Sequence, residues 1–139
     1  MKFTRISALA LALIMAALCF VSCGAKTINV NLKINCGDED VPVILDVKVP
    51  MKSNDPTVLQ TFIEGCLLNE MDYTLTDDEQ SVKDIDEYKD YVDTETNTTY
   101  YWYYTINGVE PTSGRAANNF VADGDTIEFI YTSFSPDEE

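Results

Sequence analysis

The stretch that decides the fold is Tyr100–Thr132, YYWYYTINGVEPTSGRAANNFVADGDTIEFIYT. Its five consecutive aromatic residues begin a predicted strand over residues 99–106, because aromatic side chains favour extended backbone. Asn107-Gly108 at the end of that strand is a strong signal for a two-residue hairpin turn. Asp123-Gly124-Asp125 predicts a second turn, and the alternating residues after it predict a last strand over 126–132.

Two further strands are predicted before this stretch. Residues 27–35 alternate between apolar and polar side chains, which is typical of a strand with one buried face. Residues 37–40, with the sequence GDED, predict a turn, and residues 41–49 predict a second strand. Pro42 is compatible with the start of a strand or with an edge strand. Together these segments predict a hairpin.

One helix is predicted after the hairpin. Asp55 can cap free N–H groups, and Pro56 fits the first helical position. The apolar residues that follow recur every three or four positions and form a single stripe that ends near Asn69. That stripe consists of Val58, Leu59, Phe62, Ile63, Cys66 and Leu67. A helix with one apolar face must pack that face against another element.

The segment between the helix and the aromatic strand is acidic. Residues 73–75 predict a short strand, and residues 76–97 predict a surface excursion with a helical turn around 82–91. The whole order of elements is that of an α+β domain of the β-grasp (ubiquitin-like) kind, in which one helix packs across a face of a mixed sheet. We therefore expect one domain over residues 27–133, followed by an acidic tail over 134–139.

The N-terminal segment indicates export. Lys2 and Arg5 precede an apolar run of about 16 residues, which is short for a membrane helix of roughly 20. The run ends in Phe20-Val21-Ser22-Cys23, which resembles a bacterial lipoprotein cleavage site. We expect residues 1–22 to be a signal peptide, Cys23 to carry lipid, and residues 23–26 to be a tether on the outer face of the cell membrane. The alternative is an ordinary secretory signal with an incidental cysteine.

Charge and composition exclude several function classes. The formal net charge is −15, which repels nucleic acid and anionic membrane surfaces, so we expect membrane contact through the lipid anchor alone. The sequence contains no histidine, which removes the commonest general base and the commonest transition-metal ligand. Asp84, Asp86 and Asp90 imitate calcium-loop spacing, but the loop glycine and the terminal glutamate are absent. We predict no catalytic residues, no metal site and no enzyme activity.

Two cysteines remain after Cys19 and Cys23 are set aside. Cys36 has the inward parity of the first strand, and Cys66 lies on the apolar face of the helix. The topology predicts that both lie at the same end of the core. Whether they form a disulfide or two buried thiols depends on whether the α-carbons lie within about 7 Å, which is marginal for a helix packed on a sheet.

The aromatic strand predicts a recognition surface. Tyr100, Trp102 and Tyr104 share the parity of Ile106 and are expected to face the core. Tyr101 and Tyr103 then face outwards, where two amphipathic rings suit ligand recognition. The alternative is that the segment 76–97 covers them.

Several motifs in the last part of the chain resemble one family. These are Tyr101-Trp102, Asn107-Gly108-Val109, Pro111, Gly114 and the stretch DGDTIE over 123–128. They look like the transcobalamin-like C-terminal domain, which occurs in many bacterial surface proteins and is often described only as a domain of unknown function. The resemblance extends from Thr57 to Tyr131 and is specific in the last 35 residues or so. It implies a β-grasp fold.

The resemblance also implies a ligand and a set of ligand contacts. In animal cobalamin carriers this small domain closes over the corrinoid, and the loop that corresponds to Val109–Asn119 contacts the ligand. By this analogy the loop residues Pro111, Thr112, Ser113, Gly114 and Arg115 approach the ligand. Together with Tyr101, Trp102 and Tyr103 of the aromatic strand they form the predicted ligand-binding set. The 139 residues include no counterpart of the helical barrel of those carriers and no imidazole for cobalt.

Two function hypotheses follow. In the first, the chain is a lipid-anchored, non-catalytic binding module that captures a corrinoid or another bulky small molecule, needs no cofactor and acts as a monomer. In the second, it is a surface domain for protein–protein or glycan interaction with no corrinoid binding. The outward tyrosines suit both.

Overall fold

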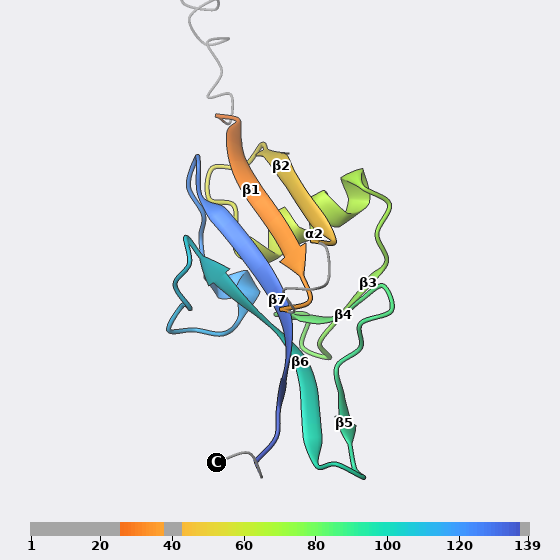
Figure 1. The fold of residues 1–139 in the computed structure, drawn as a ribbon. Helices are drawn as coiled ribbons and strands as arrows, with labels where there is room; N and C mark the ends of the chain where they lie inside the picture. Colours follow the sequence, from red (N-terminus) through yellow and green to blue (C-terminus); the bar gives the residue numbers. More distant parts are fainter. Residues whose placement is uncertain (1–25, 38–42, 137–139) are drawn as a thin grey trace, which may run out of the picture.

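The computed structural model describes residues 26–37 and 43–136, which form two sheets and one α-helix (Figure 1). The elements are β1 (Ile28–Asn35), β2 (Leu45–Met51), α2 (Val58–Leu68), β3 (Tyr73–Leu75), β4 (Val82–Ile85), β5 (Tyr91–Asp93), β6 (Thr98–Ile106), the 3-10 turn η1 (Ala116–Asn118) and β7 (Thr126–Phe134). The expected signal peptide and the lipidation residue Cys23 lie outside the described residues.

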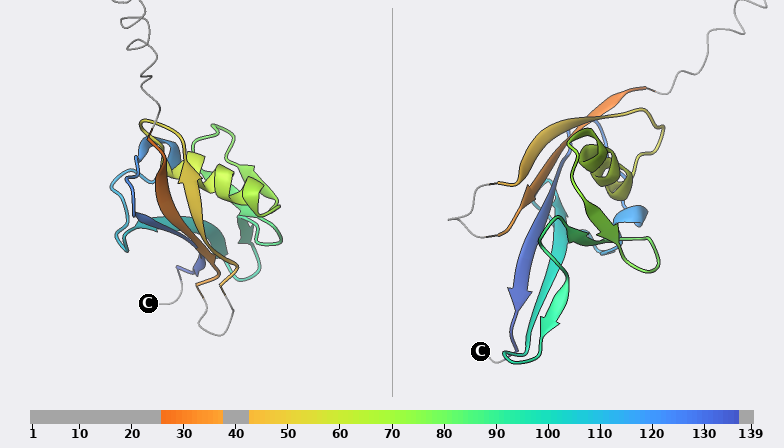
Figure 2. Two further views of the ribbon diagram at one scale, coloured as in Figure 1. Left: turned by 90° about the horizontal axis from the view of Figure 1, so that it is seen from above. Right: turned by 90° about the vertical axis from the view of Figure 1, so that its right-hand side faces the viewer.

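The main sheet is mixed and has the strand order β2-β1-β7-β6-β5. β1 and β7 pair in parallel at its centre, and the other neighbours pair antiparallel. α2 lies across one face of the sheet, and β3 and β4 form a separate hairpin beside it (Figure 2). This is the predicted α+β arrangement of a mixed sheet with a single helix, and the prediction is confirmed.

The core lies between α2 and the sheet. The inward side chains of β1 are fully buried as predicted: Val30, Leu32 and Ile34. Phe62 of α2 is also fully buried, and its ring centroid lies 4.7 Å from that of Phe129 on β7. Burial of such rings is worth roughly 1.5–3 kcal/mol each, so this contact between helix and sheet is a main source of stability.

The helix begins two residues later than the sequence predicts. Its N-cap is Thr57, whose hydroxyl accepts the Gln60 N–H at 3.2 Å while the Gln60 side chain accepts the Thr57 N–H at 3.0 Å. This reciprocal capping box satisfies two free N–H groups at once, which a cap at Asp55 could not do. The carbonyl of Pro56 instead accepts the Val121 N–H at 2.9 Å. The predicted end near Asn69 is confirmed, since Asn69 is the C-cap.

The segment 76–97 is not the surface excursion that its composition predicts, and it contains no helical turn over 82–91. It holds strands β4 and β5, and both Val82 and Ile85 are buried in the core. β4 pairs with the predicted strand β3, and the Thr74 hydroxyl donates to the Asp84 carboxylate across the hairpin at 2.6 Å. Val82 and Ile85, together with the half-buried Tyr73 and Leu75 of β3, hold this acidic hairpin against the core.

The bounds of β2 and β7 also differ from the prediction, and β2 ends at Met51 rather than at residue 49. β2 begins at Leu45 rather than residue 41, and Val43 is exposed. Residues 38–40 of the predicted turn lie outside the described residues. β7 continues to Phe134, because β6 pairs with it along its whole length and matches Thr99 with Phe134.

Cys36 and Cys66 are both free thiols. Cys66 is fully buried, and burial, with a smaller effect of the Asp86 charge, raises the pKa of its thiol to about 12. Such a thiol is almost never ionised near neutral pH and acts as a small apolar group. Cys36 is only half-buried, so the predicted pair of buried thiols holds for Cys66 alone.

No helix in residues 26–37 and 43–136 has the length and apolar character that a bilayer crossing requires.

Candidate functional site

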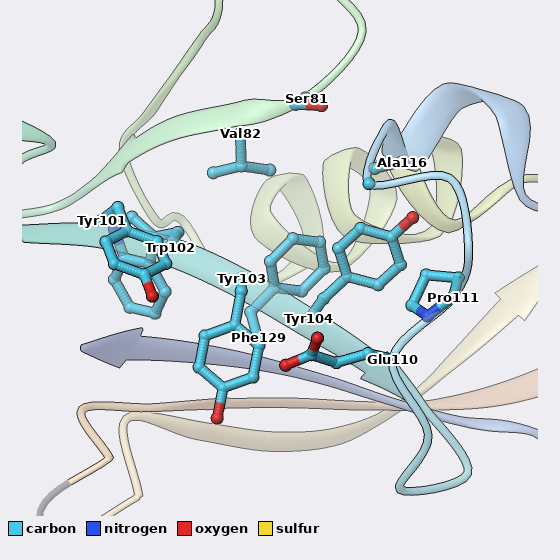
Figure 3. Close-up of a pocket in the computed structure, with 11 residues that line it drawn as sticks. Ser81, Val82, Tyr101, Trp102, Tyr103, Tyr104, Glu110, Pro111, Ala116 and Phe129 are labelled. Carbon is cyan, nitrogen blue, oxygen red and sulfur yellow. The ribbon is translucent and has the colours of Figure 1, made fainter. Parts of the chain in front are cut away.

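The aromatic strand β6 has two faces with different surroundings. Tyr104 pairs with Phe129 of β7, which packs against Phe62, so the even-numbered side chains of β6 face the helix. The odd-numbered side chains therefore face the side of the sheet away from the helix, where Thr105 is buried. Figure 3 shows Tyr103 and Tyr104 pointing to opposite sides of β6.

Burial along β6 follows the predicted parity in part. Tyr104 is buried, whereas Trp102 is half-buried and packs against the edge of the core. The Trp102 indole N–H donates to the Tyr88 carbonyl at 3.1 Å. Tyr100 is half-buried as well and stacks on Tyr91 with centroids 4.8 Å apart. The core therefore ends near Trp102. Beyond the helix, β6 continues together with β5 and the end of β7 as an extension of the sheet, which we call the ribbon.

Tyr101 and Tyr103 are half-buried, and their ring centroids lie 6.5 Å apart. The segment 76–97 packs its anchors Val82 and Ile85 into the core on the helix side, and both tyrosines stay partly exposed. Of the two alternatives left open by the sequence, the structure favours outward tyrosines that remain accessible.

The loop after β6 begins with the predicted turn. Asn107 and Gly108 have φ values of +51° and +79°, which is the left-handed region that a tight hairpin needs. Ile106 and Val109 exchange both main-chain hydrogen bonds across the turn, at 2.9 and 3.1 Å. Pro111 has no N–H to continue this pairing. The chain therefore leaves the strand and forms the loop up to Asn119.

Asn119 fixes this loop to the core. Its side-chain amide donates to the Tyr104 hydroxyl at 2.6 Å, to the Ser113 carbonyl at 2.8 Å and to the Arg115 carbonyl at 3.0 Å. Its own carbonyl accepts the N–H of Val58 at the start of the helix, at 2.9 Å. The side chain of Asn119 thus connects the loop to β6, and its main chain connects the loop to α2.

Replacing Asn119→Asp is expected to loosen the loop. The carboxylate has nearly the same shape as the amide but cannot donate, so it would face the two carbonyl oxygens without a proton. We expect a loss of about 1–3 kcal/mol in the free energy of unfolding, and faster amide exchange in the loop. Chemical denaturation and hydrogen exchange measure both. Asn118→Asp, an exposed neighbour with the same change in charge, is the control, and equal losses in the two variants would contradict the role of Asn119.

A hollow of about 220 Å³ lies where β6, the loop and the start of β4 meet (Figure 3). Its lining residues are Ser81, Val82, Tyr101, Trp102, Tyr103, Tyr104, Glu110, Pro111, Gly114, Ala116 and Phe129. Five of these belong to the predicted ligand-binding set: Tyr101, Trp102, Tyr103, Pro111 and Gly114.

Three implied contact residues do not line the hollow: Thr112, Ser113 and Arg115. Arg115 instead lies 3.5 Å from the Asp78 carboxylate, on the exposed side of the loop. Four lining residues are not indicated by the sequence: Ser81 and Val82 from the start of β4, Tyr104 from β6 and Phe129 from β7. The acidic composition of residues 76–97 predicts solvated surface, so no pattern marks Ser81 or Val82.

The charge around the hollow is negative. Burial, and then the nearby carboxylates of Glu110 and Glu128, raise the pKa of the Tyr103 phenol, which therefore stays neutral at physiological pH. The pKa of Asp78 is lowered first by a hydrogen bond from the Thr76 hydroxyl, so its carboxylate stays charged beside Arg115. The hollow thus offers aromatic faces, phenol hydroxyls and one carboxylate.

Metal binding finds no support within residues 26–37 and 43–136, where no cluster of three or more Cys, Asp or Glu side chains could hold an ion. The aspartates that imitate calcium-loop spacing serve local structure. Asp84 accepts the Asp90 N–H at 3.0 Å, and Asp86 accepts the Asp72 N–H at 2.9 Å.

The family model "Domain of unknown function (DUF4430)" matches residues 60–133, which hold the helix, the aromatic strand, the loop and β7. The chain belongs to this family. A search of curated proteins gave no match for the DUF4430 chain.

Among solved structures, the DUF4430 chain is similar to haptocorrin in complex with Cbi, with a TM-score of 0.61 and 15% identity. The match covers 79% of this chain and 26% of haptocorrin, so the chain spans about a quarter of that protein. A protein from Ruminococcus gnavus ATCC 29149 matches with a TM-score of 0.47 and 17% identity, over 77% of this chain and 98% of that one. The haptocorrin match confirms the predicted transcobalamin-like fold.

Proposed function

We propose that this DUF4430 domain is a non-catalytic binding module that captures a bulky small molecule at the hollow beside β6. The observation that carries the proposal is the convergence of Tyr101 and Tyr103 with Glu110, Pro111 and Gly114 around one accessible hollow. Rigid aromatic rings beside an anchored loop bind flat amphipathic molecules at low entropic cost.

A corrinoid is the specific ligand we propose, on the strength of the shared fold with haptocorrin. Fold similarity alone is a weak warrant for a ligand, so the size of the site matters. The hollow of about 220 Å³ is smaller than the roughly 300–1,000 Å³ of a typical small-molecule pocket. A corrinoid would therefore rest one edge in the hollow and leave most of its surface to solvent or to a second protein. With no histidine in the chain, cobalt would receive no imidazole from it.

Export and lipid attachment at Cys23 are part of the same proposal. A domain held at the outer face of a membrane could pass its ligand to a transporter. Fatty-acid labelling that persists after Cys23→Ser would contradict the anchor without affecting the binding proposal.

Calorimetry with cyanocobalamin and cobinamide tests the ligand. We expect binding that weakens about tenfold in Tyr103→Ala, which removes one ring from the rim, since a lost aromatic contact is worth on the order of 1–2 kcal/mol. Tyr91→Ala is the control, because Tyr91 is exposed on the ribbon and does not line the hollow. An absence of heat with both corrinoids would reject this ligand, and equal effects of the two substitutions would reject this site.

A further inference from the structure

The edge of β6 that faces away from β7 is open in its middle. β5 covers only Thr98–Tyr100 on this side, and Val109 covers only Ile106. The residues from 101 to 105 have no neighbouring strand there. An open edge presents unpaired N–H and C=O groups, which can pair with another extended chain.

The hydrogen bonds at the turn show which groups face this edge. Both the N–H and the C=O of Ile106 bond to Val109. In an antiparallel sheet the bonding direction alternates along a strand, so Tyr104 and Trp102 point their main-chain groups the same way. In the described part of the chain, no main-chain hydrogen bond satisfies these four groups.

Both flanking segments are held away from the edge by specific contacts. Before β5, the Tyr88 carbonyl accepts the Trp102 indole N–H, and the Lys89 carbonyl accepts the Tyr131 hydroxyl at 2.6 Å. These bonds keep residues 88–89 over the helix-side face instead of beside β6. After Val109, Pro111 ends the pairing and Asn119 holds the loop aside. Specific contacts on both sides thus keep the edge open, and the edge borders the hollow.

We propose that the β6 edge binds an extended peptide of a partner protein, which adds as an antiparallel strand opposite Trp102–Tyr104. This is strand addition, in which main-chain hydrogen bonds give affinity and pockets for alternate side chains give specificity. It goes beyond small-molecule capture, because it uses the main chain of β6 and not only its tyrosine rings.

The surroundings specify the side chains of the bound peptide. Residues opposite Trp102 and Tyr104 would project to the helix side, into the hollow between β6 and Val82, which suits apolar side chains. The residue opposite Tyr103 would project to the other face, where Glu128 of β7 lies opposite Thr105 and where Glu110 lines the hollow together with Tyr103. No ion pair to Glu110 forms within residues 26–37 and 43–136. The peptide pattern is therefore apolar–basic–apolar.

Charge also selects a foreign peptide over a second copy of this chain. Two copies with a formal net charge of −15 each would repel one another along a shared edge. A basic strand is attracted to the same edge, and its binding weakens as salt is added.

The probe for this proposal is the peptide acetyl-Ser-Val-Arg-Val-Ser-amide, titrated into isotopically labelled protein at low salt. We expect slowed exchange of the Trp102 and Tyr104 amide protons. N-methylation of both valines removes the N–H groups that face β6 and is expected to weaken binding at least about tenfold. N-methylation of the arginine, whose N–H points away, is expected to leave the affinity within about threefold. Glu110→Gln should weaken binding, whereas Glu95→Gln at the far tip of the ribbon should not.

Three results would overturn the proposal. The first is no binding at millimolar peptide, and the second is equal affinity of the two N-methylated peptides. The third is slowed exchange of the Trp102 and Tyr104 amides that depends on protein concentration and needs no peptide, since this result would assign the edge to a second copy. Corrinoid titration of the same sample reports on the small-molecule proposal separately.

Discussion

Phe62→Ala is expected to cost about 3–5 kcal/mol in the free energy of unfolding, a large part of the total stability of roughly 5–15 kcal/mol for a domain of this size. Phe62 is fully buried on α2 and lies between two rings. Its centroid is 4.7 Å from that of Phe129 on β7 and 5.5 Å from that of Tyr73 on β3. It is therefore the side chain through which helix, main sheet and hairpin contact one another, and alanine would leave a cavity that none of the three can close alone.

Chemical denaturation of Phe62→Ala measures this loss, and Phe134→Ala is the matched control. Phe134 is 60% exposed at the end of β7, so the same chemical change removes little buried surface there. We expect the control to lose less than about 1 kcal/mol. If both variants lost the same free energy, Phe62 would not join the three elements. Because Phe62 does not line the hollow, ligand binding by the folded fraction should be unchanged.

The elements with a regular apolar pattern were predictable from the sequence. The inward face of β1, the two turns around the loop and most of the stripe of α2 each follow a local pattern, and the structure confirms them. Leu67, which the periodicity also assigns to the stripe, is 64% exposed, so the buried face of α2 ends at Cys66. The start of α2 was misplaced by two residues, because Asp55 and Pro56 are good start signals by composition. Thr57 is the N-cap because Gln60 completes a capping box with it. In addition, the Pro56 carbonyl accepts the N–H of Val121, which lies 65 positions away in the sequence.

The hairpin β3–β4 shows why the rest could not be predicted. Residues 76–97 contain few apolar side chains, and only long-range packing shows that Val82 and Ile85 are buried. For the same reason one wall of the hollow was missed while the residues on β6 and the loop were indicated. The open edge of β6 also depends on contacts between residues distant in sequence, such as Trp102 with Tyr88 and Tyr131 with Lys89.

Gly65→Val is expected to destabilise the domain by about 1–3 kcal/mol through overpacking, because α2 lies close against β1 and β2 at this position. A Cβ at position 65 would overlap Cδ2 of Leu32 and lie 3.2 Å from Cγ2 of Val49. Leu32 is fully buried on β1, so its side chain has no free space to move into. Valine and glycine have similar helix propensities, differing by roughly 0.5 kcal/mol, so propensity does not offset the clash.

A double-mutant cycle separates this clash from a general effect on the helix. In a Leu32→Ala background the atom that Cβ would meet is absent, so Gly65→Val should cost at least about 1 kcal/mol less than in the native background. Glu64→Val, at the exposed neighbouring position, reports the cost of a β-branched residue alone. A cost for Gly65→Val that is equal in both backgrounds, or no larger than that of Glu64→Val, would mean that the helix can shift away from β1 and that the close approach at Gly65 is not required by the fold.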